Sequence, residues 1–235
     1  MKMKKLIFYL GLIIISICYV DASAQGVISS QTRSSQSANV KPTKNQTQAN
    51  KESQLRKLFE QGKSLYDEKK YDEAFPIILK AANGENPEAQ CLLAEMYGAG
   101  YGVEPDSDEM LKWYKKAADN GSGEGMFNVG FQYGIDEDYA EALKWYIMAS
   151  EKNFHQSYLE IGNIYKDGKG VDKDIVSAIK WYALGSENAK DGDCAYQLYE
   201  IFEEMGDTEN SKKWLKKAEE DGSVYLRIIN WSRDN

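Results

Sequence analysis

Few residues in this sequence could carry out catalysis or hold a metal ion. The chain has three cysteines and one histidine, His155. A protein zinc site gathers about four Cys, His or carboxylate ligands, and no second histidine can join His155. Neither a nucleophile nor a second ligand stands beside it, so we interpret His155 as a residue of a loop or helix start. The sequence therefore predicts no metal site and no cofactor.

Two other patterns could indicate chemistry but are better explained by structure. Adjacent carboxylates occur, for example at Glu203-Glu204, yet neighbouring side chains on a helix point about 100° apart and usually form a solvated face. Residues 98–102 read Gly-Ala-Gly-Tyr-Gly, which resembles a phosphate-binding loop. Such a loop follows a strand and opens a helix, whereas this one is expected to end a helix. We predict that the protein is not an enzyme.

The charge of the chain excludes most nucleic-acid binding. Lys and Arg number 29 against 37 Asp and Glu, which gives a formal net charge of −8. Proteins that bind DNA or RNA derive much of their affinity from basic residues that neutralise phosphates. We expect no nucleic-acid partner. With 28% charged residues, the composition also excludes a multi-pass membrane protein.

The amino terminus has the pattern of an export signal. Three lysines precede an apolar run over residues 6–20, and residues 22–24 read Ala-Ser-Ala. A basic start, an apolar run and a small-residue cleavage site are typical of a secretory signal peptide. The run is shorter than the ~20 residues that cross a bilayer core, so we expect no stable membrane insertion once the signal is cleaved. We predict a signal peptide over residues 1–24 and an exported protein.

Some alternatives remain open for this end of the chain. Cleavage of the signal and its retention as an anchor both fit the pattern, as do a periplasmic and a secreted destination. Residues 25–52, which follow, are rich in Ser, Gln, Thr and Asn. Such a segment cannot bury enough apolar surface to offset the entropy lost on ordering it. We predict a disordered polar linker over residues 25–52.

The remainder of the chain is a repeat. Four tryptophans recur at spacings of 32, 36 and 33 residues, each directly after a lysine: Trp113, Trp145, Trp181 and Trp214. Spacing of this size indicates stacked supersecondary units. Seven residues before each tryptophan stands an aspartate: Asp106, Asp138, Asp174 and Asp207. Each aspartate is predicted to cap the start of a helix, and Glu109 and Glu141 complete a capping box in two copies.

A second helix precedes each of these. It is marked by an aliphatic residue followed four positions later by an aromatic one: Leu93 and Tyr97, Val129 and Tyr133, Ile161 and Tyr165, Leu198 and Phe202. In two units, glycine turns at 98–103 and 168–171 supply the positive φ that ends a helix. Each unit is therefore expected to be a helical hairpin. We expect the tryptophans and tyrosines to pack in the core rather than to bind a ligand.

The repeated frame is Leu-Gly-x-x-Tyr, then Gly-x-Gly-Val, then Asp-x-x-x-Ala-x-x-Trp-Tyr-x-x-Ala-Ala. It resembles the Sel-one-like repeat, a relative of the tetratricopeptide repeat. The units around Trp113 and Trp181 fit the frame well. Those around Trp145 and Trp214 lack the glycine insertion and are more similar to tetratricopeptide units. An earlier unit over 62–81 lacks the tryptophan and is similar to a tetratricopeptide repeat.

The resemblance implies an all-α fold, a right-handed α-solenoid of helix-turn-helix repeats. Five repeats would cover residues 53–222, and residues 223–235 would form a C-terminal capping helix. Exported members of the family often carry a disulfide in each hairpin. In this sequence Cys91 and Cys194 fall in different units, so we expect two free, buried thiols.

The resemblance further implies a scaffold for protein interaction. By analogy with tetratricopeptide superhelices, the partner would bind a concave surface formed by the first helix of each unit. The main candidate residues are Glu95, Glu124, Phe127, Phe131, Asn163, Tyr196 and Glu200, with Glu88, Gln156 and Glu203 as further positions. Carboxylates mixed with aromatic side chains would complement a protein or peptide that carries a basic segment and an apolar anchor.

We therefore predict an exported scaffold or adaptor without catalysis of its own. The alternative is a cell-wall or glycan-associated binding module, with or without weak hydrolytic activity. Such a module would need exposed aromatic platforms, which Phe127, Phe131 and Tyr196 would have to supply.

Overall fold

The computed structural model describes residues 44–234, so the predicted signal peptide and most of the predicted linker lie outside the described residues. The chain divides into two units, 1–48 and 49–235, and nearly all described residues belong to the second. Helix α2 (Lys44–Asp67) begins inside the segment that the sequence assigned to a linker. Residues 44–52 are therefore helical rather than disordered.

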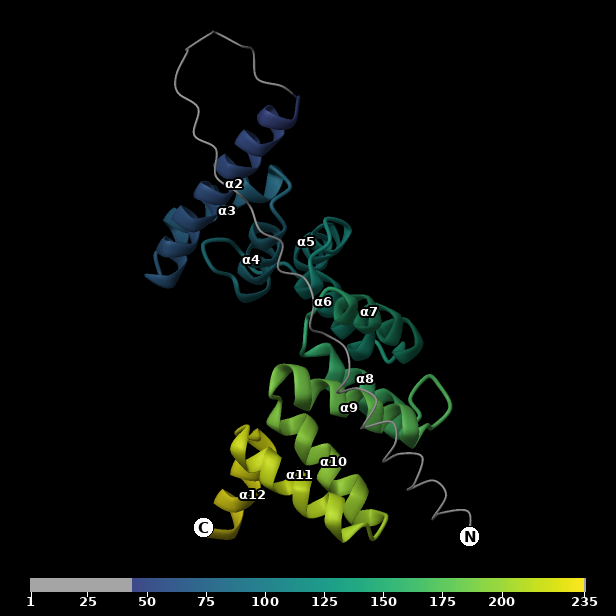
Figure 1. Ribbon diagram of the computed structural model, residues 1–235. Helices are drawn as coiled ribbons and strands as arrows, with labels where there is room; N and C mark the ends of the chain where they lie inside the picture. Colours follow the sequence, from purple (N-terminus) through teal and green to yellow (C-terminus); the bar gives the residue numbers. More distant parts are fainter. Residues whose placement is uncertain (1–43, 235) are drawn as a thin grey trace, which may run out of the picture. The chain divides into compact units, whose positions relative to one another are not determined.

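Within residues 44–234 every regular element is an α-helix, and the helices pack as successive pairs (Figure 1). The first helices of the pairs are α2, α4 (Pro87–Ala99), α6 (Gly123–Ile135), α8 (Ser157–Asp167) and α10 (Gly192–Glu204). The second helices are α3 (Tyr71–Asn83), α5 (Ser107–Asp119), α7 (Tyr139–Glu151), α9 (Ile175–Ala189) and α11 (Thr208–Glu220). Helix α12 (Val224–Asp234) packs against α10 at the carboxyl end. This arrangement is an all-α solenoid of helical hairpins, as predicted.

The predicted aspartate caps are confirmed. Each second helix from α5 to α11 begins after an aspartate whose carboxylate accepts a hydrogen bond from an amide of the first turn: Asp106, Asp138, Asp174 and Asp207. Asp106, for example, accepts from the amides of Asp108 and Glu109, both at 3.0 Å. The caps satisfy amide groups that have no partner inside the helix.

The predicted capping boxes are wrong, and the reason lies in the first helix of each hairpin. A capping box requires the Glu109 side chain to accept from the backbone amide of Asp106. That amide instead donates to the carbonyl oxygen of Tyr97 at 2.9 Å, and the other N-cap aspartates repeat this bond. Glu109 therefore turns outward to the ammonium of Lys112, 2.5 Å away. Glu141 pairs in the same way with the lysine three residues later.

Asp174 provides a measurable test of these caps. Its carboxylate accepts bonds from the Ser177 hydroxyl at 2.6 Å, the Ser177 amide at 3.2 Å and the Val176 amide at 3.0 Å. We expect Asp174→Ala to lower the free energy of unfolding by about 1 kcal/mol. Asp172→Ala, at an exposed position just before the helix, should change it by less than about 0.5 kcal/mol. Urea unfolding of the two variants measures this difference.

The cap should also give a pH dependence of known sign. The bonds from Ser177, and then from Val176, lower the pKa of Asp174 below its usual range. The stabilisation is therefore present above the unfolded-state pKa and is lost as pH falls through the lower, native pKa. The difference in the free energy of unfolding between wild type and Asp174→Ala should become smaller in strongly acidic buffer. A difference that becomes larger there would contradict the assignment of the cap.

The glycine turns both end helices and join neighbouring hairpins. Gly100 (φ 73°) and Gly168 (φ 71°) cap α4 and α8 in the left-handed conformation, as predicted. Gly102 (φ 70°) reaches back to the preceding hairpin, where a Cβ added to it would lie 2.4 Å from the carbonyl oxygen of Tyr71. Gly170 approaches the start of α7 in the same manner, 2.7 Å from the amide of Ala140. The turns are thus contact points between repeats.

The aromatic side chains form much of the core, as predicted. Trp214 and Tyr182 are fully buried and Trp113 is nearly so, whereas Trp145 and Trp181 are half-buried. The two cysteines of the described chain, Cys91 and Cys194, are free and buried. This confirms the prediction of two free thiols. No helix between residues 44 and 234 combines the length and hydropathy needed to cross a membrane.

Candidate partner-binding surface

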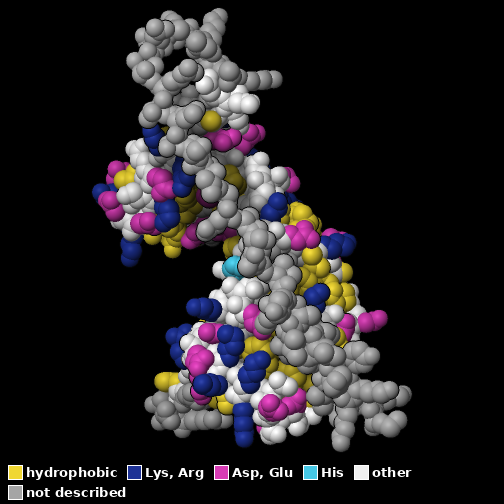
Figure 2. All heavy atoms as spheres, in the orientation of Figure 1, with side chains coloured by type: hydrophobic (Ala, Val, Ile, Leu, Met, Phe, Trp, Pro, Cys, Tyr) yellow, Lys and Arg dark blue, Asp and Glu magenta, His cyan; other side chains and the backbone are white. Residues whose placement is uncertain are grey.

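The first helices of neighbouring hairpins lie side by side. Helix α4 contacts α6, and α8 contacts α10, in addition to the contacts within each hairpin. We call the surface formed by the accessible side chains of α4, α6, α8 and α10 the first-helix face. The candidate residues predicted from the sequence lie on these helices, except Gln156, which is the residue just before α8. Figure 2, which displays one side of the molecule, shows acidic and basic side chains interspersed with hydrophobic ones.

Three carboxylates gather where α4 and α6 meet. Glu88 and Glu95 belong to α4, Glu124 begins α6, and all three side chains reach solvent. The pKa of Glu124 is raised, first because neighbouring atoms remove part of its carboxylate from water and then because of the charges of Glu95 and Glu88. The Tyr66 hydroxyl of α2 donates a hydrogen bond to Glu95 at 2.7 Å. This part of the first-helix face is therefore a site of concentrated negative charge that favours a cationic ligand.

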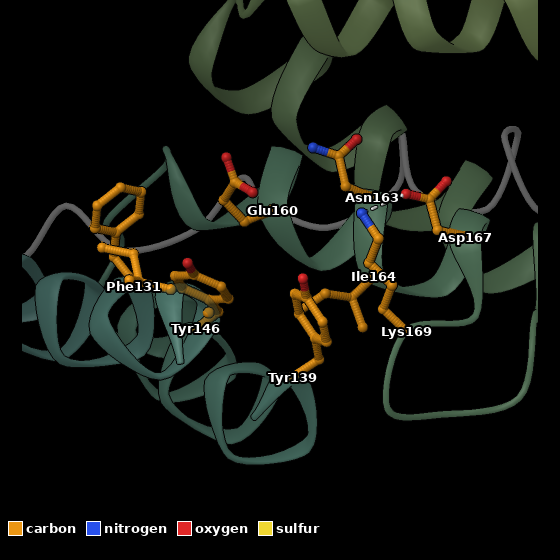
Figure 3. Close-up of a pocket in the computed structure, with 10 residues that line it drawn as sticks. Phe131, Tyr139, Tyr146, Glu160, Asn163, Ile164, Asp167 and Lys169 are labelled. Carbon is orange, nitrogen blue, oxygen red and sulfur yellow. Dashed lines mark ion pairs between the residues drawn. The ribbon is translucent and has the colours of Figure 1, made fainter. Parts of the chain in front are cut away.

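A pocket of about 290 Å³ opens between α6, α7 and α8. It contains two of the predicted residues, Phe131 and Asn163. Figure 3 shows the Phe131 and Tyr146 rings on one side and Tyr139 with Lys169 on the other. Glu160 and Asn163 lie along α8 above them. The remaining lining residues are Gly134, Ile135, Ile164 and Asp167.

The polar side of the pocket is held in place by a buried tyrosine. The hydroxyl of Tyr182, whose side chain is fully buried, donates to Asn163 Oδ1 at 2.8 Å. This bond leaves the Asn163 amide nitrogen free to donate to Glu160, toward which it points in Figure 3. The pKa of Glu160 is raised, because burial outweighs the opposing effects of Asn163 and Lys169. The pocket thus contains an ordered, half-buried carboxylate that is costly to keep ionised.

The apolar side of the pocket is accessible to a partner. Phe131 is 52% exposed and Ile135 is 59% exposed, both at the end of α6. Behind them, Tyr146 is buried and its ring centroid lies 5.3 Å from that of Phe127. Phe127 is only half-buried but packs into this cluster. Phe131 is therefore accessible at the wall of the pocket, whereas Phe127 supports the wall from within.

The predicted residues of α10, and Gln156 just before α8, do not line this pocket. Tyr196 of α10 is only 8% exposed, and its ring packs against Tyr225 of α12 with centroids 5.7 Å apart. It therefore belongs to the contact with the capping helix rather than to an open surface. Glu200 lies one turn further along α10 and is partly exposed. Gln156 and Glu203 are exposed, and Glu203 accepts a hydrogen bond from the Ser211 hydroxyl at 2.5 Å.

Glu160 offers a stability test of the pocket. Because burial raises its pKa, the folded protein binds the Glu160 proton more tightly than the unfolded chain does. The ionised carboxylate therefore opposes folding at neutral pH, and its contribution becomes less unfavourable as pH falls through the raised pKa. We expect Glu160→Gln to leave Tm unchanged or raise it by up to roughly 3 °C at pH 7. Differential scanning fluorimetry, with the exposed Glu151→Gln as control, measures this. A clear decrease in Tm for Glu160→Gln would show that the ionised carboxylate stabilises the folded protein.

Within residues 44–234, no three His, Cys, Asp or Glu side chains are grouped so that they could hold a metal ion. Both cysteines of this part are poor nucleophiles. Burial raises the pKa of Cys91 to about 12 and also raises that of Cys194. The first-helix face carries concentrated carboxylates where α4 meets α6 and borders an accessible pocket.

Comparison with known proteins agrees with the repeat organisation. The family model of the Sel1 repeat matches residues 87–122, 123–154, 155–189 and 195–223. The crystal structure of a Sel1 repeat protein from Oxalobacter formigenes is 31% identical, with 73% of this chain and 74% of that chain covered and a TM-score of 0.67.

A second solved structure shares the fold. It is c5321, a protective antigen of uropathogenic Escherichia coli with an SLR fold, which is 22% identical with a TM-score of 0.65. The alignment covers 75% of this chain but only 40% of the antigen. No match was found among the curated proteins. The repeats that the family model matches and the similarity to the Oxalobacter protein show that this chain belongs to the Sel1 repeat family.

Proposed function

We propose that this protein is an exported scaffold that binds a protein or peptide partner on its first-helix face and catalyses no reaction itself. Sel1 repeat proteins are generally scaffolds for protein interaction. Export is supported by the basic start, the apolar run over 6–20 and the Ala-Ser-Ala of residues 22–24. The destination that we propose is the periplasm or the exterior of the cell.

The observation that carries the proposal is the combination of charge and apolar surface on adjacent first helices. Glu88, Glu95 and Glu124 gather where α4 meets α6, and Phe131 is exposed at the other end of α6. A partner with basic residues and one apolar anchor complements both parts. The charges would guide association, and the buried anchor would slow dissociation.

In-cell crosslinking, followed by affinity purification of the full chain and mass spectrometry, tests this proposal. Wild type should capture a specific protein in stoichiometric amounts, and the double variant Glu95→Lys/Glu124→Lys should lose it. The matched control is Glu104→Lys/Glu151→Lys, which changes the net charge equally at exposed positions outside the first helices. Circular dichroism must show both variants to be folded.

The outcomes separate the proposal from its competitors. Capture that survives the reversal of Glu95 and Glu124 would contradict binding at this face. Recovery of glycan or wall fragments without a protein would favour a glycan-binding module. Of the three aromatic residues that such a module would need, only Phe131 is exposed, because Tyr196 is buried and Phe127 packs into an aromatic cluster.

A further inference from the structure

We propose that the pocket between α6, α7 and α8 binds a single arginine side chain of the partner, whose guanidinium pairs with Glu160. The inference rests on the proposed function and adds a specific chemical recognition to it. Three features of the pocket carry it: a half-buried carboxylate beside an ordered amide, aromatic walls, and a size that suits one side chain.

Glu160 is the anionic group of the pocket that remains free to pair with a ligand cation. The pocket has a second carboxylate, Asp167, but its Oδ2 is ion-paired with Lys169 at 3.0 Å. The Lys169 ammonium also lies 5.6 Å from the centroid of the Tyr139 ring. Its charge affects Glu160 less than the burial of Glu160 does. An incoming cation would therefore offset the energetic cost of keeping the half-buried Glu160 carboxylate ionised.

The polar wall beside Glu160 is ordered before any ligand arrives. Tyr182 is 0% exposed, and its hydroxyl fixes the orientation of the Asn163 amide through a 2.8 Å hydrogen bond. The Asn163 amide nitrogen points toward Glu160 and favours its ionised form. A ligand cation therefore meets partly preorganised surroundings, which favours affinity.

The walls favour arginine over lysine. Phe131, Tyr139 and Tyr146 all line the pocket, and Phe131 is 52% exposed. A planar guanidinium stacks on aromatic rings and binds a carboxylate through two parallel hydrogen bonds. A lysine ammonium is more strongly hydrated and has no planar face to stack. The arginine stem would lie on the exposed Ile135 at the rim.

The dimensions agree with one side chain. At about 290 Å³ the pocket is at the lower limit of those that bind small molecules, which are roughly 300–1,000 Å³. It is also open to solvent, because Phe131 and Ile135, which line it, are both more than half exposed. An extended partner segment could therefore insert one residue here while its basic neighbours approach Glu95 and Glu124.

Selection from a random dodecapeptide display library against the full chain tests the proposal and does not require the partner to be identified. We expect the enriched peptides to share one arginine beside an apolar residue. Fluorescence anisotropy of an enriched peptide should show binding roughly 10- to 100-fold weaker when its arginine is replaced by lysine or citrulline. The protein variant Glu160→Gln should weaken binding of the original peptide to a similar degree, and the control variant Glu151→Gln should not weaken it.

A double-mutant cycle distinguishes direct pairing from an indirect structural effect. In the Glu160→Gln variant, replacing the peptide arginine by citrulline should weaken binding only slightly further, because the ion pair between Glu160 and the arginine is already broken. Phe131→Ala should also weaken binding of the arginine peptide. Met148→Ala, at a 41% exposed position on α7, should leave this binding unchanged.

Several results would overturn the arginine pocket. The selection could enrich no peptide, or the enriched peptides could lack arginine. The losses of affinity from Glu160→Gln and from the change of arginine to citrulline could also be additive in the double-mutant cycle. The proposed function would survive these results if the cellular partner were still captured in a manner sensitive to Glu95 and Glu124. If arginine peptides bound as expected but no cellular protein were captured, the pocket would stand and the scaffold proposal would fail.

Discussion

Trp214→Ala is expected to lower the free energy of unfolding by about 4 kcal/mol, the largest effect of any substitution considered for this protein. Trp214 is 1% exposed and packs in α11 of the fifth hairpin. Removing its indole forfeits the burial of a large apolar surface and leaves a cavity that the neighbouring helices cannot fill. Trp231 offers a matched control because it is 68% exposed on α12.

Urea unfolding followed by circular dichroism measures the two losses. Trp231→Ala should change the free energy of unfolding by less than about 1 kcal/mol. Equal losses for the two variants would mean that the repeated tryptophan is not a core residue. Because stacked repeats can unfold in parts, the transitions should also be followed by intrinsic fluorescence, and agreement of the two probes is required.

Gly102→Ala is expected to lower the free energy of unfolding by about 3 kcal/mol. Two causes add: a residue with a Cβ is strained at φ 70°, and that Cβ would lie 2.4 Å from the Tyr71 carbonyl oxygen. The oxygen belongs to the backbone of the preceding hairpin, so it cannot move aside as a flexible side chain would. The glycine turn would have to leave its contact with α3.

Gly121→Ala is the control that separates strain from contact. Gly121 has φ 85°, and an added Cβ would meet nothing within 4 Å. Only the strain of the left-handed conformation remains, which costs about 1 kcal/mol. A loss at Gly102 no greater than that at Gly121, measured by urea unfolding, would show that the turn does not join the two hairpins.

Local patterns in the sequence predicted most of the fold. The second helices begin at the expected aspartates because a cap acts within a few residues of itself. The capping boxes failed because the amide of Asp106 is taken by Tyr97, a residue of the other helix in the hairpin. Contacts that join separate helices leave weaker signals in sequence than contacts within one turn.

The candidate surface was harder to predict for the same reason. Two of the predicted residues, Phe131 and Asn163, line the pocket, because their helical register places them on the first-helix face. Glu160 and Lys169 line it too but were not predicted, because the pocket combines three helices and a turn. Lys169 reaches it because Gly170 packs on the start of α7 in the preceding hairpin. Tyr196 was expected to be accessible, but α12 covers it.

The measurement that tests the scaffold proposal most directly is photocrosslinking in intact cells from two positions of one hairpin. The photoreactive residue p-benzoylphenylalanine would replace Phe131 on α6 in one version of the full chain and Met148 on α7 in another. Both positions are accessible, with exposures of 52% and 41%, but only Phe131 belongs to the first-helix face. We expect a discrete crosslinked protein from position 131, its loss on adding Glu95→Lys/Glu124→Lys, and no equivalent product from position 148. Crosslinking from position 148 with none from position 131 would contradict binding at the first-helix face.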